Sequence, residues 1–276
     1  MAKQCAETVK QIASQTKDGL GNFRFCVAAA AVDYIPFFPI AKSASTISIQ
    51  RSSTPVYKFA IGLENGVLVH RLMQQCSTIA NIPTVLASGF VDALTPVQQL
   101  CEQLSNDTFQ FVGIDTSLNP SLDAGGSIAA AIEVLDEVES FGGPGTLAAA
   151  SIITHTLQSL PGIKHCGYSG IMLPLCEDQR LSALTCTINH QAAALRISDL
   201  LSISQVCGVG IDTVPIPGDC STKDLASVLL DVAGLAHRWN KSLSCRVFPV
   251  PGKKVGDRTN FDSPYMINAN ILSLSP

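Results

Sequence analysis

The sequence predicts an α/β protein in which parallel strands are joined by helical crossovers. Short, continuously apolar runs alternate along the chain with segments of helical spacing, the pattern of strands that are covered on both faces of a sheet. No repeat period and no low-complexity linker divides the chain. We therefore expect a single α/β domain over residues 1–276.

The expected elements follow one another at short intervals. Apolar runs predict strands at 23–32, 57–63, 109–114, 168–173, 207–216 and 244–250. Helical spacing and capping signals predict helices at 3–17, 64–79, 95–105, 127–140, 144–160, 177–183, 192–204 and 221–239. The last helix has the clearest pattern, since Ser221 and Asp224 form its start signal.

Two segments near the N-terminus fit no regular element. Residues 41–56 are rich in Ser and Thr and predict neither a helix nor a strand. The segment IPFFPI at 35–40 contains two prolines, which oppose a regular element, and two phenylalanines, which are too apolar for a free loop. We expect this segment to pack over the mouth of a pocket.

The composition is unusually poor in charge. Hydrophobic residues make up 46% of the chain and charged residues 14%, against about 25% charged residues in an average globular protein. Such a chain hides a large core or covers its surface with copies of itself. We expect a homo-oligomer, with a generous core as the alternative.

Several classes of protein are disfavoured. The net charge is −4 and no long basic run occurs, so nucleic-acid binding has little support. No apolar run reaches the roughly 18–20 residues that span a bilayer, and the N-terminus lacks a signal-peptide core. The ten cysteines include no CxxC pair, which fits reduced thiols in a cytoplasmic protein rather than a zinc ribbon.

Acidic residues recur where the predicted strands end. Asp115 follows the strand 109–114 and Glu177 follows 168–173, while the last two strands lead to Asp212, Asp219 and Asp257. Because ligands gather at the carboxyl ends of parallel strands, we expect these side chains to meet at one pocket. Ordinary loop solvation or helix capping is the alternative.

The residue types indicate acid/base chemistry. Asp212 lies between Ile211 and Val214, where partial desolvation raises the pKa of a carboxyl group and suits proton transfer. Asp219 and Asp257 are the further candidate catalytic residues. Asp212 could instead accept backbone N–H bonds, and Asp219 could serve the dipole of the following helix. Glu177 with Asp212 and Asp219 could also hold Mg²⁺ or Ca²⁺.

Basic residues and a glycine-rich turn predict a site for an anion. The turn FGGPGT at 141–146 precedes a helix, so the N–H groups around Gly143, Gly145 and Thr146 could bind a negatively charged group. Arg246 and Lys253 could hold the same group. The alternatives are a plain helix corner and a solvated basic surface. The sequence thus favours an acid/base enzyme that acts on a small anionic metabolite, with a metal-dependent enzyme and a non-catalytic binding or scaffold protein as rivals. It does not identify a cofactor.

Long motifs resemble one known family. They are IPFFP (35–39), FGGPGT (141–146), YSGIMLPLCED (168–178), VCGVGIDTVPIPGD (206–219) and RVFPVPGKKVGD (246–257). The chain resembles, almost end to end, the family labelled domain of unknown function 711, or "PFL family" proteins. The resemblance implies a barrel similar to that of pyruvate formate-lyase.

The resemblance does not imply the chemistry of that enzyme. The tail after residue 259 contains no glycine, and the chain has no adjacent cysteine pair, so we expect no glycyl radical. Family members are typically longer at the N-terminus. We therefore expect an open barrel, or one completed by another chain.

Overall fold

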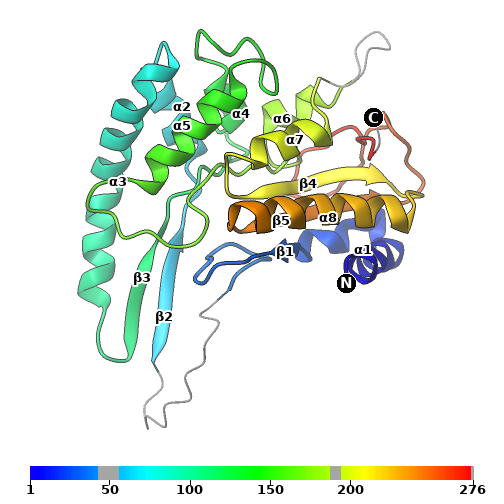
Figure 1. Cartoon of the computed structure of the whole chain (residues 1–276), viewed down its shortest axis with the longest axis horizontal. Coiled ribbons are helices and arrows are strands. Elements are labelled where there is room, and N and C mark those ends of the chain that lie inside the picture. Colours follow the sequence, from blue (N-terminus) through cyan, green and yellow to red (C-terminus); the bar gives the residue numbers. More distant parts are fainter. Residues whose placement is uncertain (43–55, 187–193, 275–276) are drawn as a thin grey trace.

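The computed structural model describes residues 1–42, 56–186 and 194–274. Within these residues the protein is a mixed α/β structure with two small sheets, neither of which closes into a barrel (Figure 1). The strands are β1 (Val27–Ala29), β2 (Tyr57–Gly62), β3 (Phe109–Asp115), β4 (Gly210–Pro217) and β5 (Leu243–Val250). One sheet has the order β1-β5-β4, with β1 antiparallel to β5 and β4 parallel to it, and the other pairs β2 with β3 in parallel.

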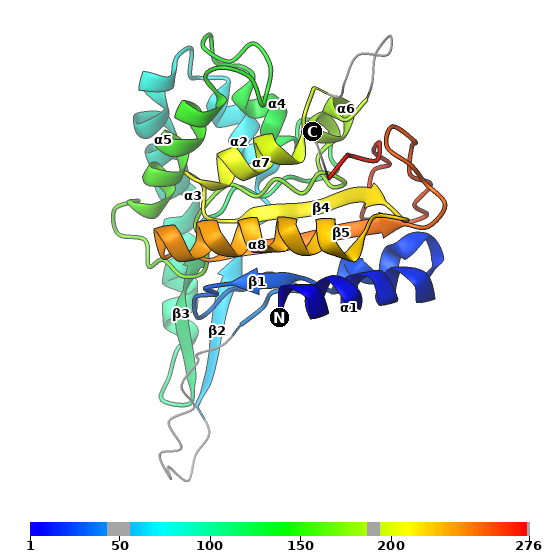
Figure 2. The same cartoon turned by 45° about the vertical axis from the view of Figure 1, so that its right-hand side comes forward.

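Helices cover these sheets. They are α1 (Ala2–Gln15), α2 (Gly66–Met73), α3 (Ile82–Leu104), α4 (Ile128–Ile132), α5 (Thr146–Gln158), α6 (Gln179–Leu184), α7 (Ile197–Ser204) and α8 (Thr222–Trp239), with 3-10 turns η1 (Lys17–Arg24) and η2 (Ile79–Asn81). Helix α8 lies along β4 and β5 with α1 beside it, and α3 runs beside β3 (Figures 1 and 2).

An extended segment joins the two sheets. Residues 165–174 form isolated parallel bridges to β3 on one side and to β4 on the other. The strands therefore follow the series β2, β3, this segment, β4, β5 and β1. The predicted strand 168–173 is irregular because Gly167 and Ser169 have φ values of 64° and 47°, in the left-handed region that strands do not use.

Helix α3 differs most from the prediction. We expected a helix at 95–105 with Pro96 in its first turn, but α3 begins at Ile82 and continues through Pro96. A proline removes one helical hydrogen bond. The hydroxyl of Thr95 donates to Val91 O at 2.7 Å in the same turn, and the buried Phe90, Leu94 and Cys101 hold both halves of the helix on one core face.

Several expected elements are shorter in the structure. The regions 64–79, 127–140, 144–160 and 23–32 contain α2, α4, α5 and β1, each flanked by turns or loops. The expected elements at 109–114, 207–216, 221–239 and 244–250 agree closely with β3, β4, α8 and β5. Residues 43–55 and 187–193, which contain most of the Ser/Thr-rich stretch and the start of the expected helix 192–204, lie outside the described residues.

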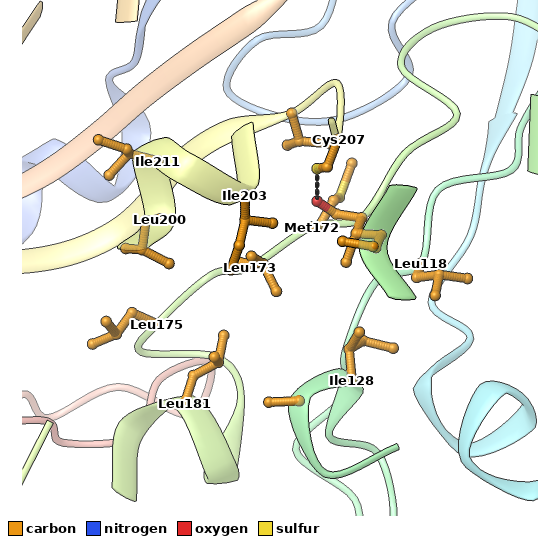
Figure 3. Packing of buried hydrophobic residues seen from close by; sticks show 14 of the residues in the cluster. Leu118, Ile128, Met172, Leu173, Leu175, Leu181, Leu200, Ile203, Cys207 and Ile211 are labelled. Atoms are coloured by element: carbon orange, nitrogen blue, oxygen red, sulfur yellow. Dashed lines mark hydrogen bonds between the residues drawn. The ribbon is translucent and has the colours of Figure 1, made fainter. Parts of the chain in front are cut away.

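One core connects the elements around residues 165–174. Leu118, Ile128, Leu173 and Leu200 come from four parts of the chain and belong to this one buried cluster (Figure 3). The thiol of Cys207 donates to Ile171 O at 3.0 Å within this core, so this cysteine serves as a buried packing residue. None of the helices in the described ranges has the length and apolar character that crossing a membrane requires.

Candidate functional site

A buried arginine forms the centre of the candidate site. Arg246 lies within β5, and its side chain is only 7% exposed. Its Nε donates to Asp212 Oδ1 at 2.5 Å, and its Nη2 donates to Asp212 Oδ2 at 3.0 Å and to Glu177 Oε1 at 2.8 Å. Nη1 donates to the carbonyl of Phe23 at 3.2 Å. Because a guanidinium carries five N–H donors, these bonds leave one available.

A bulge in β4 directs Asp212 toward this arginine. The register between β4 and β5 shifts between Ile211 and Val214. Thr213 has a φ of 44°, a strained conformation for a β-branched residue. Its hydroxyl accepts a hydrogen bond from Cys176 N at 3.1 Å, which ties the bulge to the residue before Glu177. Bulges of this kind commonly re-aim a side chain beside an active site.

Glu177 is the group in this cluster that titrates near neutral pH. Its side chain is 25% exposed and follows the extended segment 165–174. Burial and, after it, the negative charge of Asp212 raise the pKa of Glu177 to about 7, while the charge of Arg246 opposes this increase. Burial alone lowers the pKa of Arg246, but the charge and hydrogen bonds of Asp212 reverse this, so Arg246 stays a cation.

Two further protic groups lie close to the cluster. Burial raises the pKa of the Cys26 thiol to about 12 and also raises that of Tyr168. The Tyr168 hydroxyl is buried and makes no hydrogen bond of standard geometry with the part of the chain that the structure describes. Both groups therefore stay protonated at neutral pH, whereas Glu177, with a pKa of about 7, both gains and loses its proton there.

The cluster lines a small cavity with aromatic walls. The cavity has a volume of about 120 Å³ and contains Glu177, Asp212 and Arg246 in its lining. The other lining residues include Phe23, Phe37, Phe38, Pro39, Ile40, Asn119, Tyr168 and Met172. The segment 35–40 thus contributes to a pocket wall, as its composition predicted. Ile35 and Lys42 exchange two backbone hydrogen bonds of 3.1 Å, which close this segment into a loop.

Asp115 lies outside the cavity lining and has a structural role. It is fully buried and accepts hydrogen bonds from Ser117 N and Oγ at 3.0 and 2.6 Å and from Tyr168 N and Ser169 N at 2.7 and 2.9 Å. Burial raises its pKa, and these bonds oppose the increase. Asp115 therefore holds the extended segment beside β3.

The expectation of one shared rim is wrong for three other residues. Asp219 and Asp257 are exposed in loops after β4 and β5, and Asp257 accepts a turn hydrogen bond from Lys254 N at 2.8 Å. Lys253 lies in the same loop, where its carbonyl accepts from Gly218 N at 3.3 Å. The cavity lies across the amino-terminal halves of β4 and β5, so residues beyond the carboxyl ends of these strands do not line it.

The glycine-rich turn is closed by its own hydrogen bonds. Gly142 N donates to Thr146 Oγ1 at 3.0 Å, Gly143 N to Ser140 O at 3.0 Å and Thr146 N to Gly143 O at 3.2 Å. Gly145 has a φ of 87°, and a Cβ there would lie 2.0 Å from Glu137 O. These contacts use the N–H groups of Gly143 and Thr146. The turn therefore acts as a helix corner outside the lining of the cavity, and anion binding there stays a prediction.

The predicted set of metal-binding carboxylates is not assembled. Glu177 and Asp212 share the cavity, but Asp219 does not. Over residues 1–42, 56–186 and 194–274, no group of three or more His, Cys, Asp or Glu side chains is placed to hold a metal ion.

Sequence reasoning did not select Asp178, the residue after Glu177. Asp178 is fully buried and accepts hydrogen bonds from Ser127 Oγ at 2.5 Å and Ile128 N at 2.8 Å, at the start of α4. It also accepts from Arg180 N and Leu181 N at 2.9 and 3.0 Å, at the start of α6. An acidic residue before a helical pattern is a known capping signal, but the second helix could not be foreseen. By capping two helices, Asp178 fixes the position of Glu177.

Fold and site together define an α/β protein with an open sheet and a buried arginine–carboxylate cluster. The chain belongs to the family described as "Uncharacterised ACR (DUF711)", whose model matches residues 1–263. This confirms the resemblance that its motifs indicated.

Curated relatives carry the name "UPF0210 protein". One from Listeria monocytogenes is 29% identical over 272 residues, covering 94% of this chain and 56% of the relative. One from Lactiplantibacillus plantarum is 30% identical over 264 residues, covering 92% and 55% of the two chains. A third, from Limosilactobacillus reuteri, is 37% identical over 158 residues, covering 55% and 33%. The chain spans about half the length of the first two relatives.

Proposed function

We propose that the cavity is the active site of an acid/base enzyme in which Glu177 transfers the proton. The observation that carries this proposal is the pKa of about 7 at Glu177, caused by burial and by the neighbouring Asp212. A group that titrates near the working pH serves as both proton donor and acceptor. Perturbed carboxylates in clefts are also enriched at functional sites.

The other members of the cluster position Glu177. Arg246 binds Asp212 through two hydrogen bonds and Glu177 through one, so the two carboxylates are held apart by a shared cation. The strained bulge at Thr213 supports this interpretation, because strain of this kind collects at functional sites. Arg246 and Asp212 are therefore positioning residues, and Glu177 is the catalytic residue.

The cavity favours a small uncharged molecule over an anion. Asp212 already neutralises the charge of Arg246, and four of the five N–H donors of Arg246 are in use. The aromatic walls suit an apolar portion, and the unpartnered hydroxyl of Tyr168 suits one polar atom. The substrate class is a hydroxy or carbonyl compound of a few heavy atoms.

Deuterium exchange tests this proposal without knowledge of the natural reaction. A panel of small ketones, hydroxyketones and aldehydes is incubated with the protein in D₂O, and loss of the C–H signals is followed by proton NMR. We expect exchange of at least one compound with the native protein, and with Glu139→Gln, which changes an exposed glutamate. Exchange should be lost in Glu177→Gln. Equal exchange by Glu177→Gln, or none with any compound, contradicts the proposal.

We also propose that the sheet is part of a barrel similar to that of pyruvate formate-lyase. The series of β2, β3, the segment 165–174, β4 and β5 supports this, because its members follow one another in parallel. The greater length of the curated relatives supplies residues for further strands. A structure of the Listeria monocytogenes relative tests this: added strands should continue from β2 or β1, and a second, separate sheet contradicts it.

Two expectations from composition are kept as proposals. Homo-oligomer formation is supported by the exposed apolar side chains of Val97, Leu100 and Leu104 on one side of α3, and sedimentation velocity measures it directly. A cytoplasmic location is supported by the ten cysteines, which all lie in the described residues as free thiols.

A further inference from the structure

A second cavity, of about 430 Å³, lies at the amino ends of β4 and β5. Its volume is within the range of small-molecule sites. Thr154 and Gln158 of α5 form one wall, Gln205 follows α7, Trp239 ends α8, and Lys241 lies between α8 and β5. Glu177, Asp212 and Arg246 do not contribute to its lining.

Lys241 gives this cavity its charge. Its Nζ donates to the carbonyls of Gln205 and Cys207, both at 2.8 Å. An ammonium group has three N–H donors, so one remains for a ligand. The lining contains no Asp or Glu side chain among the described residues, so the positive charge is balanced by carbonyl dipoles alone.

A buried hydroxyl in the same cavity has no partner. Thr154 is 5% exposed, and its Oγ1 makes no hydrogen bond within the described ranges. Two residues further along α5, Thr156 Oγ1 donates to Ile152 O at 2.8 Å, as a helical threonine commonly does. A buried polar group without a partner destabilises the folded state, and a ligand that reaches Thr154 and accepts a hydrogen bond from its hydroxyl offsets this cost.

The rim of the cavity presents a flat aromatic surface. Trp239 is 52% exposed, and the guanidinium of Arg238 lies 4.8 Å from the centre of one face of its ring system. An exposed indole offers a stacking surface for a planar group. The cavity therefore combines a cation, uncharged polar groups and an aromatic surface.

We propose that this cavity is a binding site for a small organic anion with a planar portion. Lys241 binds the anionic group, the hydroxyl of Thr154 and the amides of Gln158 and Gln205 supply hydrogen bonds, and the planar portion packs on Trp239. This site is independent of the acid/base function proposed for Glu177.

The chain contains a single tryptophan, so the indole N–H signal of Trp239 reports on this cavity alone. The full chain is titrated with benzoate, benzamide and benzamidine, which share one ring and differ in charge. We expect benzoate to shift the indole signal saturably at millimolar concentration, benzamide to bind at least tenfold more weakly, and benzamidine to cause no saturable shift. No shift with benzoate, or equal binding of all three, overturns the proposal.

Three variants separate recognition from folding. Lys241→Arg keeps the charge and should bind benzoate within about threefold of the native protein, whereas Lys241→Gln should bind at least tenfold more weakly. Thr154→Val removes only the unpartnered hydroxyl, so its melting temperature should not fall. Its benzoate affinity should nevertheless fall by about 3–10-fold. If Lys241→Gln does not fold, the benzoate affinity of Thr154→Val tests the proposal instead. Unchanged benzoate affinity in a folded Thr154→Val overturns the proposal.

Discussion

The molecule places two basic side chains, the buried Arg246 and the half-buried Lys241, in two cavities and uses them differently. Arg246 forms ion pairs with two carboxyl groups, so its charge serves to hold Asp212 and Glu177 in position. Lys241 is held by two carbonyls, and its charge stays available. The partners of a buried cation, rather than the cation itself, decide whether a cavity favours proton transfer or anion binding.

Tyr168 connects the two cavities, since it lines both. The residue belongs to the segment 165–174, which lies between β3 and β4. Asp115 holds this segment through the backbone N–H groups of Tyr168 and Ser169. The wall between the cavities is therefore fixed by a buried carboxylate that takes no part in either site.

Replacing Arg246 should have the largest effect. In Arg246→Met, Asp212 and Glu177 remain close together without a cation, and breaking a buried ion pair in this way costs about 3–5 kcal/mol. Chemical denaturation measures this loss in the free energy of unfolding.

Lys241→Met is the matched comparison for this variant. It leaves two carbonyls without one of their donors and leaves no carboxylate unpaired, so its cost should be about 1–2 kcal/mol. If both variants lost the same free energy of unfolding, the ion pairs of Arg246 would contribute no more to stability than the carbonyl hydrogen bonds of Lys241. This result would contradict the proposed difference between the two cavities. The double variant Arg246→Met/Glu177→Gln should regain part of the stability, since one buried charge is removed.

Stability should depend on pH through Glu177. The pKa of this group rises from 4.5 to about 7 on folding, so the folded state retains a proton that the unfolded state releases. Raising the pH through this window therefore destabilises the native protein relative to Glu177→Gln, by up to roughly 3 kcal/mol. Denaturation of both proteins between pH 4 and pH 8 measures the difference, and a constant difference contradicts the assignment.

Tyr168→Phe should have the smallest effect on stability. The Tyr168 hydroxyl is buried and makes no hydrogen bond of standard geometry within the described residues, although the side chain of Ser244 lies close enough to lower its pKa. Its removal should therefore change the free energy of unfolding by less than about 0.5 kcal/mol or raise it. A loss above about 1 kcal/mol would reveal a partner for this hydroxyl and weaken its proposed role as a ligand contact.

The sequence was sufficient to predict part of this arrangement. Continuous apolar runs located β3, β4 and β5, because strands buried on both faces need them. Glu177, Asp212 and Arg246 were selected because charged residues beside such runs are rare in a chain with 14% charge. The segment 35–40 was selected because two phenylalanines between prolines need a surface to cover.

The remaining features of the site depend on which side chains pair in the folded structure. A single sequence does not contain this information. Arg246 was expected to bind an anionic ligand, but the bulge at Thr213 turns Asp212 toward it. Asp115 looked equivalent to Asp212, yet four donors satisfy it, two from Ser117 and two from the distant segment 165–174. Lys241 was overlooked because a lysine at the end of a helix is usually a solvated surface residue.

Direct titration of Glu177 tests the central claim most closely. Carbon NMR of glutamate side-chain carboxyls, with the signal assigned by its loss in Glu177→Gln, gives the ionisation midpoint of this one group in the folded protein. We expect a midpoint of about 7. A midpoint near the ordinary value of 4.5 would show that Glu177 is already ionised at neutral pH and would remove the basis for proton transfer in this cavity.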